Sequence, residues 1–186
     1  SETRNWVVVL DVDETVLDNS QYALELVEMN VSHTQELWVK WVLREESTLI
    51  PGAKAFIDSV RTLRPKAHIA YLTDRKFEQE QESTINNLRR LGVFQEGDIL
   101  LTKKGSEDTK EGRRRCLERG TGRCEKYGPL VILALLGDNI RDFMPVKGLE
   151  QAKFLREEQV PQDPNWGRKY FMLPNPTYGS WERDYQ

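Results

Sequence analysis

The pattern of apolar and polar positions divides the chain into short apolar runs and longer amphipathic stretches. Runs rich in β-branched residues predict strands over residues 6–10, 68–72, 98–101, 130–136 and 170–173. Apolar positions at helical spacing predict helices over residues 20–28, 34–45, 53–63, 77–91 and 110–118. Because the strands alternate with helices, we expect an α/β fold in which a mostly parallel sheet carries helices on both faces.

The segment between the first two strands is expected to form a small helical insert. Ser32 and Gln35 have the spacing of a capping box, which predicts the start of the second helix of this insert. Pro51 and Gly52 close the segment. We therefore expect a cap over residues 18–50 and a core over residues 1–17 and 51–186.

Length, net charge and the longest apolar run limit the kinds of partner that this chain can have. At 186 residues the chain is long enough for one domain with a continuous core. Its 27 basic and 30 acidic residues give a net charge of −3, which disfavours nucleic-acid polymers as partners. The longest apolar run, residues 130–136, is far shorter than the roughly 20 residues of a membrane helix, so we expect no membrane span.

The chain has two cysteines, Cys116 and Cys124, with seven residues between them. Such a pair can close a small disulfide loop in an oxidising compartment, or it can be two unrelated thiols, and the spacing alone does not decide. The chain opens at Ser1 without a charged and apolar leader, which fits both a processed chain and a cytosolic protein.

Acidic residues follow the first and the fourth predicted strand. Asp11 and Asp13 come directly after the first, and Asp138 and Asp142 come after the fourth. Parallel strands place their carboxyl ends at one edge of the sheet, so we expect these carboxylates to converge there. Carboxylates and a substrate phosphate are the oxygen ligands that Mg²⁺ prefers. The pattern predicts a magnesium site, although an acidic turn after a strand is common by itself.

Two further residues fall just beyond predicted elements. Thr73 ends the second strand as a hydroxyl donor, and Lys110 opens a helix, where its ammonium adds to the positive helix terminus. A threonine at a strand end is usually a cap and a lysine at a helix start is usually solvated. Together with the carboxylates, they favour phosphoryl chemistry over these ordinary roles.

Two longer segments resemble signatures of a known family. Residues 11–20 are similar to the first signature of the haloacid-dehalogenase (HAD)-like hydrolases, and residues 137–143 to the last. Residues 38–42, 51–53, 71–75 and 173–182 resemble further segments of the class C bacterial acid phosphatases, which are related to the outer-membrane lipoprotein 5'-nucleotidases. The resemblance runs nearly end to end. It implies a three-layer Rossmann-like, HAD-like fold and a magnesium-dependent phosphomonoesterase.

The resemblance also implies the roles of the acidic residues. Asp11 is then the nucleophile that forms an aspartyl-phosphate, and Asp13 is the general acid and base. Asp11, the backbone carbonyl of Asp13, and Asp138 bind Mg²⁺. Asp142 orders the metal-bound water and does not bind the metal itself. A carboxylate at the position of Asp13 separates phosphatases from dehalogenases and transport ATPases of the same superfamily.

The phosphate-binding residues follow from the same resemblance. Thr73 and Lys110 hold the phosphoryl group. Lys110 is preferred to Lys103 and Lys104 because Arg113 follows it by three residues, as in the family. The basic run over residues 113–115 is expected to be a solvated helix face.

Aromatic residues are the expected substrate contacts. By resemblance, Trp38 in the insert and Tyr178 in the tail touch the leaving group, and stacking of a base would favour nucleoside monophosphates. Trp38 and Trp41 lie one helical turn apart, and we expect one of them to be a core residue. His33 and His68 are expected to be structural.

Two other functions remain open from sequence: a phosphoprotein phosphatase of the same superfamily and a surface lipoprotein that binds a ligand without turnover. Histidine and cysteine phosphatases are excluded, because neither histidine nor cysteine stands in the required motif. By resemblance, the partners are a small phosphomonoester and a second copy of the chain in a homodimer. The location implied is the bacterial periplasm, the outer membrane or the exterior.

Overall fold

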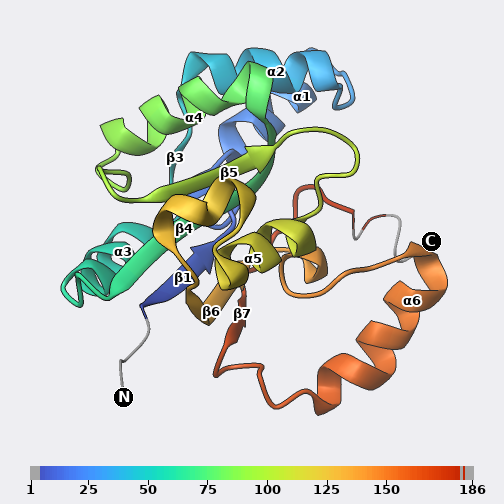
Figure 1. Cartoon of the computed structure of the whole chain (residues 1–186). Coiled ribbons are helices and arrows are strands. Elements are labelled where there is room, and N and C mark those ends of the chain that lie inside the picture. Colours follow the sequence, from blue (N-terminus) through green and yellow to red (C-terminus); the bar gives the residue numbers. More distant parts are fainter. Residues whose placement is uncertain (1–4, 181, 183–186) are drawn as a thin grey trace.

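The computed structural model describes residues 5–180 and residue 182. At its centre lies a five-stranded parallel sheet in the order β5-β4-β1-β6-β7, and β2 and β3 form a separate antiparallel pair (Figure 1). The strands are β1 (Trp6–Leu10), β2 (Leu17–Asp18), β3 (Thr48–Leu49), β4 (Ala67–Lys76), β5 (Ile99–Lys103), β6 (Val131–Gly137) and β7 (Tyr170–Met172).

Helices connect these strands and cover both faces of the sheet. The α-helices are α1 (Ser20–Met29), α2 (Gln35–Arg44), α3 (Ala53–Arg61), α4 (Phe77–Arg90), α5 (Lys110–Arg119) and α6 (Gly148–Phe154). Shorter helical segments are η1 (Gly122–Tyr127), η2 (Ile140–Asp142), η3 (Leu155–Gln159) and η4 (Val160–Gln162). Every strand and helix expected from the sequence is present, and the predicted α/β fold is confirmed. Sequence patterns did not predict β2, β3 or the helical turns between β6 and β7.

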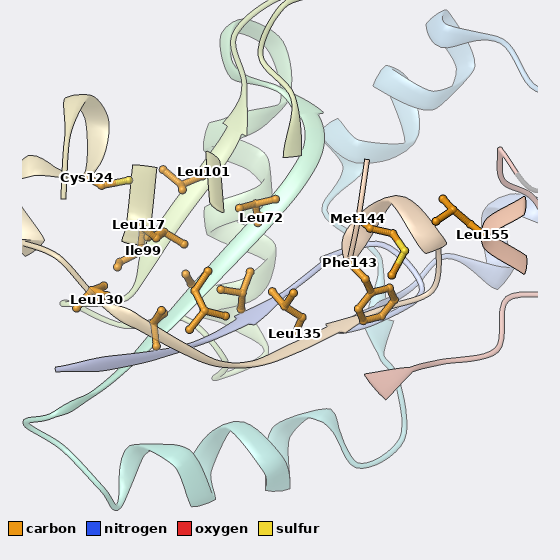
Figure 2. Close-up of a cluster of buried hydrophobic side chains, with 14 residues drawn as sticks. Leu72, Ile99, Leu101, Leu117, Cys124, Leu130, Leu135, Phe143, Met144 and Leu155 are labelled. Atoms are coloured by element: carbon orange, nitrogen blue, oxygen red, sulfur yellow. The ribbon is translucent and has the colours of Figure 1, made fainter. Parts of the chain in front are cut away.

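The core has two halves because β1 is buried on both faces. Val7 and Val9 point into the cluster of Figure 2, which also holds Leu117 of α5. Val8 and Leu10 point to the opposite face, where Ile57 of α3 packs. Successive side chains of a strand face opposite ways, so a continuous apolar run fills both halves. This arrangement gives the three layers expected from the sequence.

The two helices between β2 and β3 lie beyond the sheet, and α2 packs beside α4 (Figure 1). Asp18 pairs with Thr48 and Leu17 with Leu49, so the segment leaves and re-enters the core at one place. Its interior is a separate cluster of Tyr22, Trp38, Trp41 and Val42, and Leu26, Leu37 and Tyr178 pack against it.

The start of α2 differs from the expected capping box. Thr34, not Ser32, is the N-cap residue, and its hydroxyl accepts a hydrogen bond from the Leu37 backbone N–H at 3.2 Å. Gln35 is already helical, and its side chain donates instead to Glu80 of α4 at 3.2 Å. Threonine is itself a good N-cap, and its extended backbone places the hydroxyl three residues before Leu37. The predicted capping box is therefore wrong, although the helix is correct.

Cys116 and Cys124 form a disulfide, with their Cα atoms 5.6 Å apart. The bond joins the last turns of α5 to η1. Of the two alternatives that the spacing left open, the structure contains the disulfide.

The carboxyl ends of the strands carry the polar residues of interest. Asp11 follows β1, Asp138 follows β6, and Thr73 lies in β4 where the pairing with β5 is interrupted between Leu72 and Lys76. Parallel strands bring these positions to one edge of the sheet. Within residues 5–180, no helix is both long and apolar enough to cross a bilayer.

Candidate active site

Asp11 lies at the centre of the carboxyl edge. Its backbone N–H donates to the Leu136 carbonyl at 2.9 Å, which continues the ladder between β1 and β6 by one residue. Its side chain is buried, and one carboxylate oxygen lies 2.9 Å from Nζ of Lys110. The same ammonium pairs with Asp142. Lys110 therefore bridges two buried carboxylates.

Asp11, Asp138 and Asp142 form a carboxylate cluster whose oxygens lie within 4.8 Å of one another. Burial and the negative charge of Asp142 raise the pKa of Asp11 well above its usual value, against the opposing effect of Lys110. One ammonium cannot neutralise three carboxylates. A divalent cation with oxygen ligands would relieve the repulsion, so the donor set fits a hard ion such as Mg²⁺. Asp142 belongs to this candidate group, and its expected role in ordering metal-bound water stays a prediction.

The position of Asp142 depends on Gly137. The Asn139 backbone N–H donates to the Asp142 carboxylate at 2.9 Å, and the Asn139 side chain in turn accepts from the Arg141 N–H at 3.1 Å. A Cβ atom on Gly137 would lie 2.2 Å from the Asp142 carboxylate. Only glycine at the end of β6 allows this close approach.

Two arginines hold the first turns of α5 and thereby Lys110. Arg113 donates to the Leu101 carbonyl at 3.0 Å and also to the Thr73 carbonyl, which ties α5 to the ends of β4 and β5. Arg114 donates to the Asp142 carbonyl at 2.8 Å. Both arginines are buried, so the predicted solvated face is wrong for them and correct only for Arg115. Buried carbonyls at strand ends need donors, and long arginine side chains supply them.

Asp13 has partners of its own, outside the carboxylate cluster. Its carboxylate accepts from Nη2 of Arg75 at 2.7 Å and from Nε of the same arginine at 3.1 Å. Asn19 donates to it at 2.9 Å. Arg75 is anchored in turn by a 3.1 Å hydrogen bond to Thr84 of α4. The side chain of Asp13 is therefore fixed in place, and the metal role of its backbone carbonyl stays a prediction.

The hydroxyl of Thr73 is buried at the same edge. Its oxygen accepts from the Arg75 backbone N–H at 3.1 Å. A hydroxyl that accepts still has its own hydrogen to donate, so Thr73 can serve a phosphate oxygen. The sequence predicted that Thr73 ends its strand, whereas β4 continues to Lys76, so Thr73 lies within the strand at the break in its pairing with β5.

A cavity of about 380 Å³ joins these groups to the helical cap. All predicted site residues line it: Asp11, Asp13, Trp38, Thr73, Lys110, Asp138, Asp142 and Tyr178. The rings of Trp38 and Tyr178 lie 6.1 Å apart at an angle of 60°. Trp41, in contrast, is a core residue that donates to Asn19 at 2.8 Å, as expected for one of the two tryptophans.

His33 also lines the cavity, where its Nδ1 lies 2.9 Å from the Tyr22 hydroxyl. This bond within the cap agrees with the expected structural role. His68 is half-buried in β4, away from the cavity-lining residues.

Sequence reasoning missed several residues that support the site. Glu14 has a left-handed backbone with φ of 54°, and its buried carboxylate accepts from the Asn19 N–H at 2.8 Å and from the Tyr178 hydroxyl. Burial and the nearby Asp13 raise the pKa of Glu14 to about 7. Asn175 donates to Asp138 at 2.7 Å. The tail is thus bound to both acidic segments.

The profile of the HAD superfamily, subfamily IIIB (acid phosphatase), matches residues 1–181. The chain belongs to this family. It is therefore an acid phosphatase, a phosphomonoesterase of the HAD type. Of the sequence segments that resemble the family, only Trp181 in residues 173–182 lies outside the described residues.

Solved structures agree with this assignment. The chain is 28% identical to the class C acid phosphatase from Bacillus anthracis with tungstate bound, with a TM-score of 0.76 over 98% of this chain and 72% of that chain. A second structure of the same phosphatase gives 28% identity and a TM-score of 0.74, over 100% and 74%. A putative beta-phosphoglucomutase from Thermotoga maritima is 16% identical, with a TM-score of 0.51 over 96% and 90%, and shows a shared fold alone.

Proposed function

We propose that this acid phosphatase is Mg²⁺-dependent, acts through an aspartyl-phosphate on Asp11, and prefers nucleoside monophosphates. The observation that carries the proposal is the buried carboxylate of Asp11, which lies 2.9 Å from Lys110 and beside Asp138 and Asp142. When bound, Mg²⁺ supplies positive charge that neutralises these carboxylates and the substrate phosphate. Tungstate, an anion of phosphate-like shape, binds the related phosphatase from Bacillus anthracis.

The residues of this chain divide the reaction between them. An Asp11 oxygen bonds to phosphorus as the ester P–O bond breaks, and Asp13 gives its proton to the departing alkoxide. Water then bonds to phosphorus and gives a proton to Asp13, while the bond from phosphorus to Asp11 breaks and releases phosphate. Lys110 and Thr73 hold the phosphoryl oxygens. Arg75 and Asn19 keep Asp13 in one orientation throughout.

The cap is the proposed source of nucleotide preference. In the cap over residues 18–50, Trp38 lines the cavity with its ring 6.1 Å from that of Tyr178, and the Arg75 guanidinium lies 5.6 Å from the Trp38 ring centre. An aromatic pair of this kind can take a base by stacking, which is worth about 1–3 kcal/mol per base and does not select one base strictly. A cap over the site also excludes bulk water from the reacting groups.

The test is phosphate release from AMP, p-nitrophenyl phosphate and a phosphopeptide, each with Mg²⁺ and with excess EDTA. We expect release from AMP with Mg²⁺, little with EDTA, and little from the peptide. Faster turnover of the peptide would favour the phosphoprotein phosphatase instead. Equal rates with Mg²⁺ and EDTA would contradict the metal dependence.

The aromatic contact is tested in the same assay. Trp38→Ala should raise KM for AMP about tenfold more than KM for p-nitrophenyl phosphate, because only AMP carries a base to stack. Trp38→Phe keeps a ring and should recover most of the affinity. Phe94→Ala, distant from the cavity, is the control for packing loss. Equal effects of Trp38→Ala on both substrates would refute the nucleotide preference.

The disulfide supports a place for the enzyme in an oxidising compartment, the bacterial periplasm or the exterior. Alkylation of the denatured, unreduced protein purified from its native source should leave both cysteines unmodified. Modification of both would contradict this proposal and leave the catalytic one intact.

A further inference from the structure

A second cavity of about 870 Å³ lies beside the active site. The last residue of β4, the first residues of α4 and the end of β5 line it, and it shares Gln35 and Asp74 with the catalytic cavity. Three lysines face it: Lys76, Lys103 and Lys104. None of them belongs to the machinery described above.

The lysines outnumber the acids in the lining of this cavity. Lys76 and Lys103 are register partners on adjacent strands, an arrangement in which like charges repel. Within residues 5–180, neither forms a salt bridge, and Nζ of Lys104 lies 4.2 Å from the Phe77 ring centre. The acids of the lining are Asp74, which pairs with Arg113, and the exposed Glu78. The cavity therefore carries excess positive charge.

Asp74 links this charge to the catalytic centre. Burial works to raise its pKa, but the positive charges of Lys110, Arg113 and Lys103 outweigh burial and hold the pKa below its usual value. The Asp74 carboxylate is thus stabilised in its charged form by both Lys110 of the active site and Lys103 of the second cavity. Asp74 and Gln35 line both cavities, so the two cavities adjoin at these side chains.

We propose that Lys76, Lys103 and Lys104 bind a second phosphate group of the substrate, so that the enzyme prefers nucleoside bisphosphates to monophosphates. This inference rests on the proposed function, because the phosphate to be cleaved must lie at Asp11. Ammonium groups pair with phosphate as point charges, and Phe77 gives the cavity an apolar side for the ribose. Binding of a dianion would relieve the repulsion between Lys76 and Lys103.

The experiment compares kcat/KM for adenosine 3',5'-bisphosphate with kcat/KM for AMP, both with Mg²⁺ and with p-nitrophenyl phosphate as a reference. We expect the wild-type ratio to exceed one. The double variant Lys76→Met and Lys103→Met should lower that ratio about tenfold, equal to about 1.4 kcal/mol, mainly through KM of the bisphosphate. Lys153→Met removes one exposed charge elsewhere and is the matched control, with an unchanged ratio. High salt should reduce the wild-type ratio as well.

A wild-type ratio at or below one, or a ratio that the double variant leaves unchanged, would overturn the inference. If AMP is cleaved and the ratio fails, the proposed function stands and only the second subsite is wrong. If p-nitrophenyl phosphate is cleaved but neither nucleotide is, the nucleotide preference fails instead. A Lys103→Arg variant keeps the charge and should keep the ratio, which separates a role in binding from a role in folding.

Discussion

Two buried charge clusters at opposite ends of the sheet differ in the balance between negative and positive side chains. At the amino end, Asp98 precedes β5 with its side chain fully buried, and it pairs with Arg61 at 2.6 Å and with Arg64. The Gln95 N–H donates to it at 2.9 Å. One carboxylate therefore has two cations and a backbone donor, and every partner is supplied by the protein.

At the carboxyl end the balance is reversed. The carboxylates here are those of Asp11, Asp138 and Asp142. Of these three carboxylates, Lys110 pairs with Asp11 and Asp142, and burial together with repulsion from Asp142 raises the pKa of both Asp11 and Asp138. The comparison separates two uses of buried charge. A satisfied cluster stabilises the fold, whereas a cluster with too few cations is costly to the fold and is suited to bind an ion and a phosphate.

The largest expected effect comes from Asp11→Asn. Without a nucleophilic carboxylate, turnover should fall by about 10⁴-fold or more. The melting temperature of the metal-free protein should stay the same or rise, because one of three mutually repelling carboxylates is removed. Phosphate release and a thermal melt measure both. Near-normal turnover by pure variant protein would refute the nucleophile.

Asp13→Asn should reduce turnover of AMP by about 10²- to 10⁴-fold, the usual contribution of a general acid and base. The loss should be smaller in the first step with p-nitrophenyl phosphate, whose leaving group needs no proton. A burst of p-nitrophenol followed by slow phosphate release would show this. Equal losses in both steps for both substrates would instead indicate a structural role for the pair with Arg75.

At the other end of the sheet, Asp98→Asn should lower stability and spare the chemistry. Breaking a buried ion pair costs about 3–5 kcal/mol, and we expect about 2 kcal/mol here because Arg64 remains partly exposed to water. Denaturant unfolding measures the change, and kcat at 25 °C should be unchanged. Glu36→Gln, which breaks an exposed pair with Lys40, is the control and should leave stability unchanged. If the Asp98→Asn protein had wild-type stability, the claim that this cluster stabilises the fold would be wrong.

The smallest effect concerns Glu14. Its pKa is raised from 4.5 unfolded to about 7 folded, so the folded state holds the proton more tightly and stability is lost as pH rises from about 4.5 to 7. Glu14→Gln removes this titration. Relative to wild type, the stability of the metal-free variant should rise between pH 4.5 and 8. If the difference in stability between Glu14→Gln and wild type were the same at every pH, the raised pKa would be contradicted.

The sequence predicted the elements that apolar patterns define. Residues 6–10 and 130–136 are buried strands with an acid directly after each, so the positions of Asp11 and Asp138 followed from local pattern and parallel-strand geometry. The resemblance to a family added Trp38 and Tyr178, which no periodicity identifies as substrate contacts. Both lie at the predicted cavity.

The supporting contacts could not be predicted, because they join residues far apart in the chain. Arg75 reaches Asp13 across 62 positions and Tyr178 reaches Glu14 across 164. The basic run over residues 113–115 has the composition of a solvated face, and only the packing of α5 against strand ends shows that Arg113 and Arg114 are buried. Tertiary structure decides which charges have buried partners.

The central claim is that the carboxylates at the ends of β1 and β6 surround one divalent ion. Isothermal titration of Mg²⁺ into the metal-free enzyme tests it most directly, with Asp138→Asn as the variant and Asp98→Asn as the matched loss of a carboxylate. We predict one ion per wild-type chain, affinity at least about tenfold weaker in Asp138→Asn, and unchanged affinity in Asp98→Asn. Equal binding of Mg²⁺ by the wild type and Asp138→Asn would contradict the account.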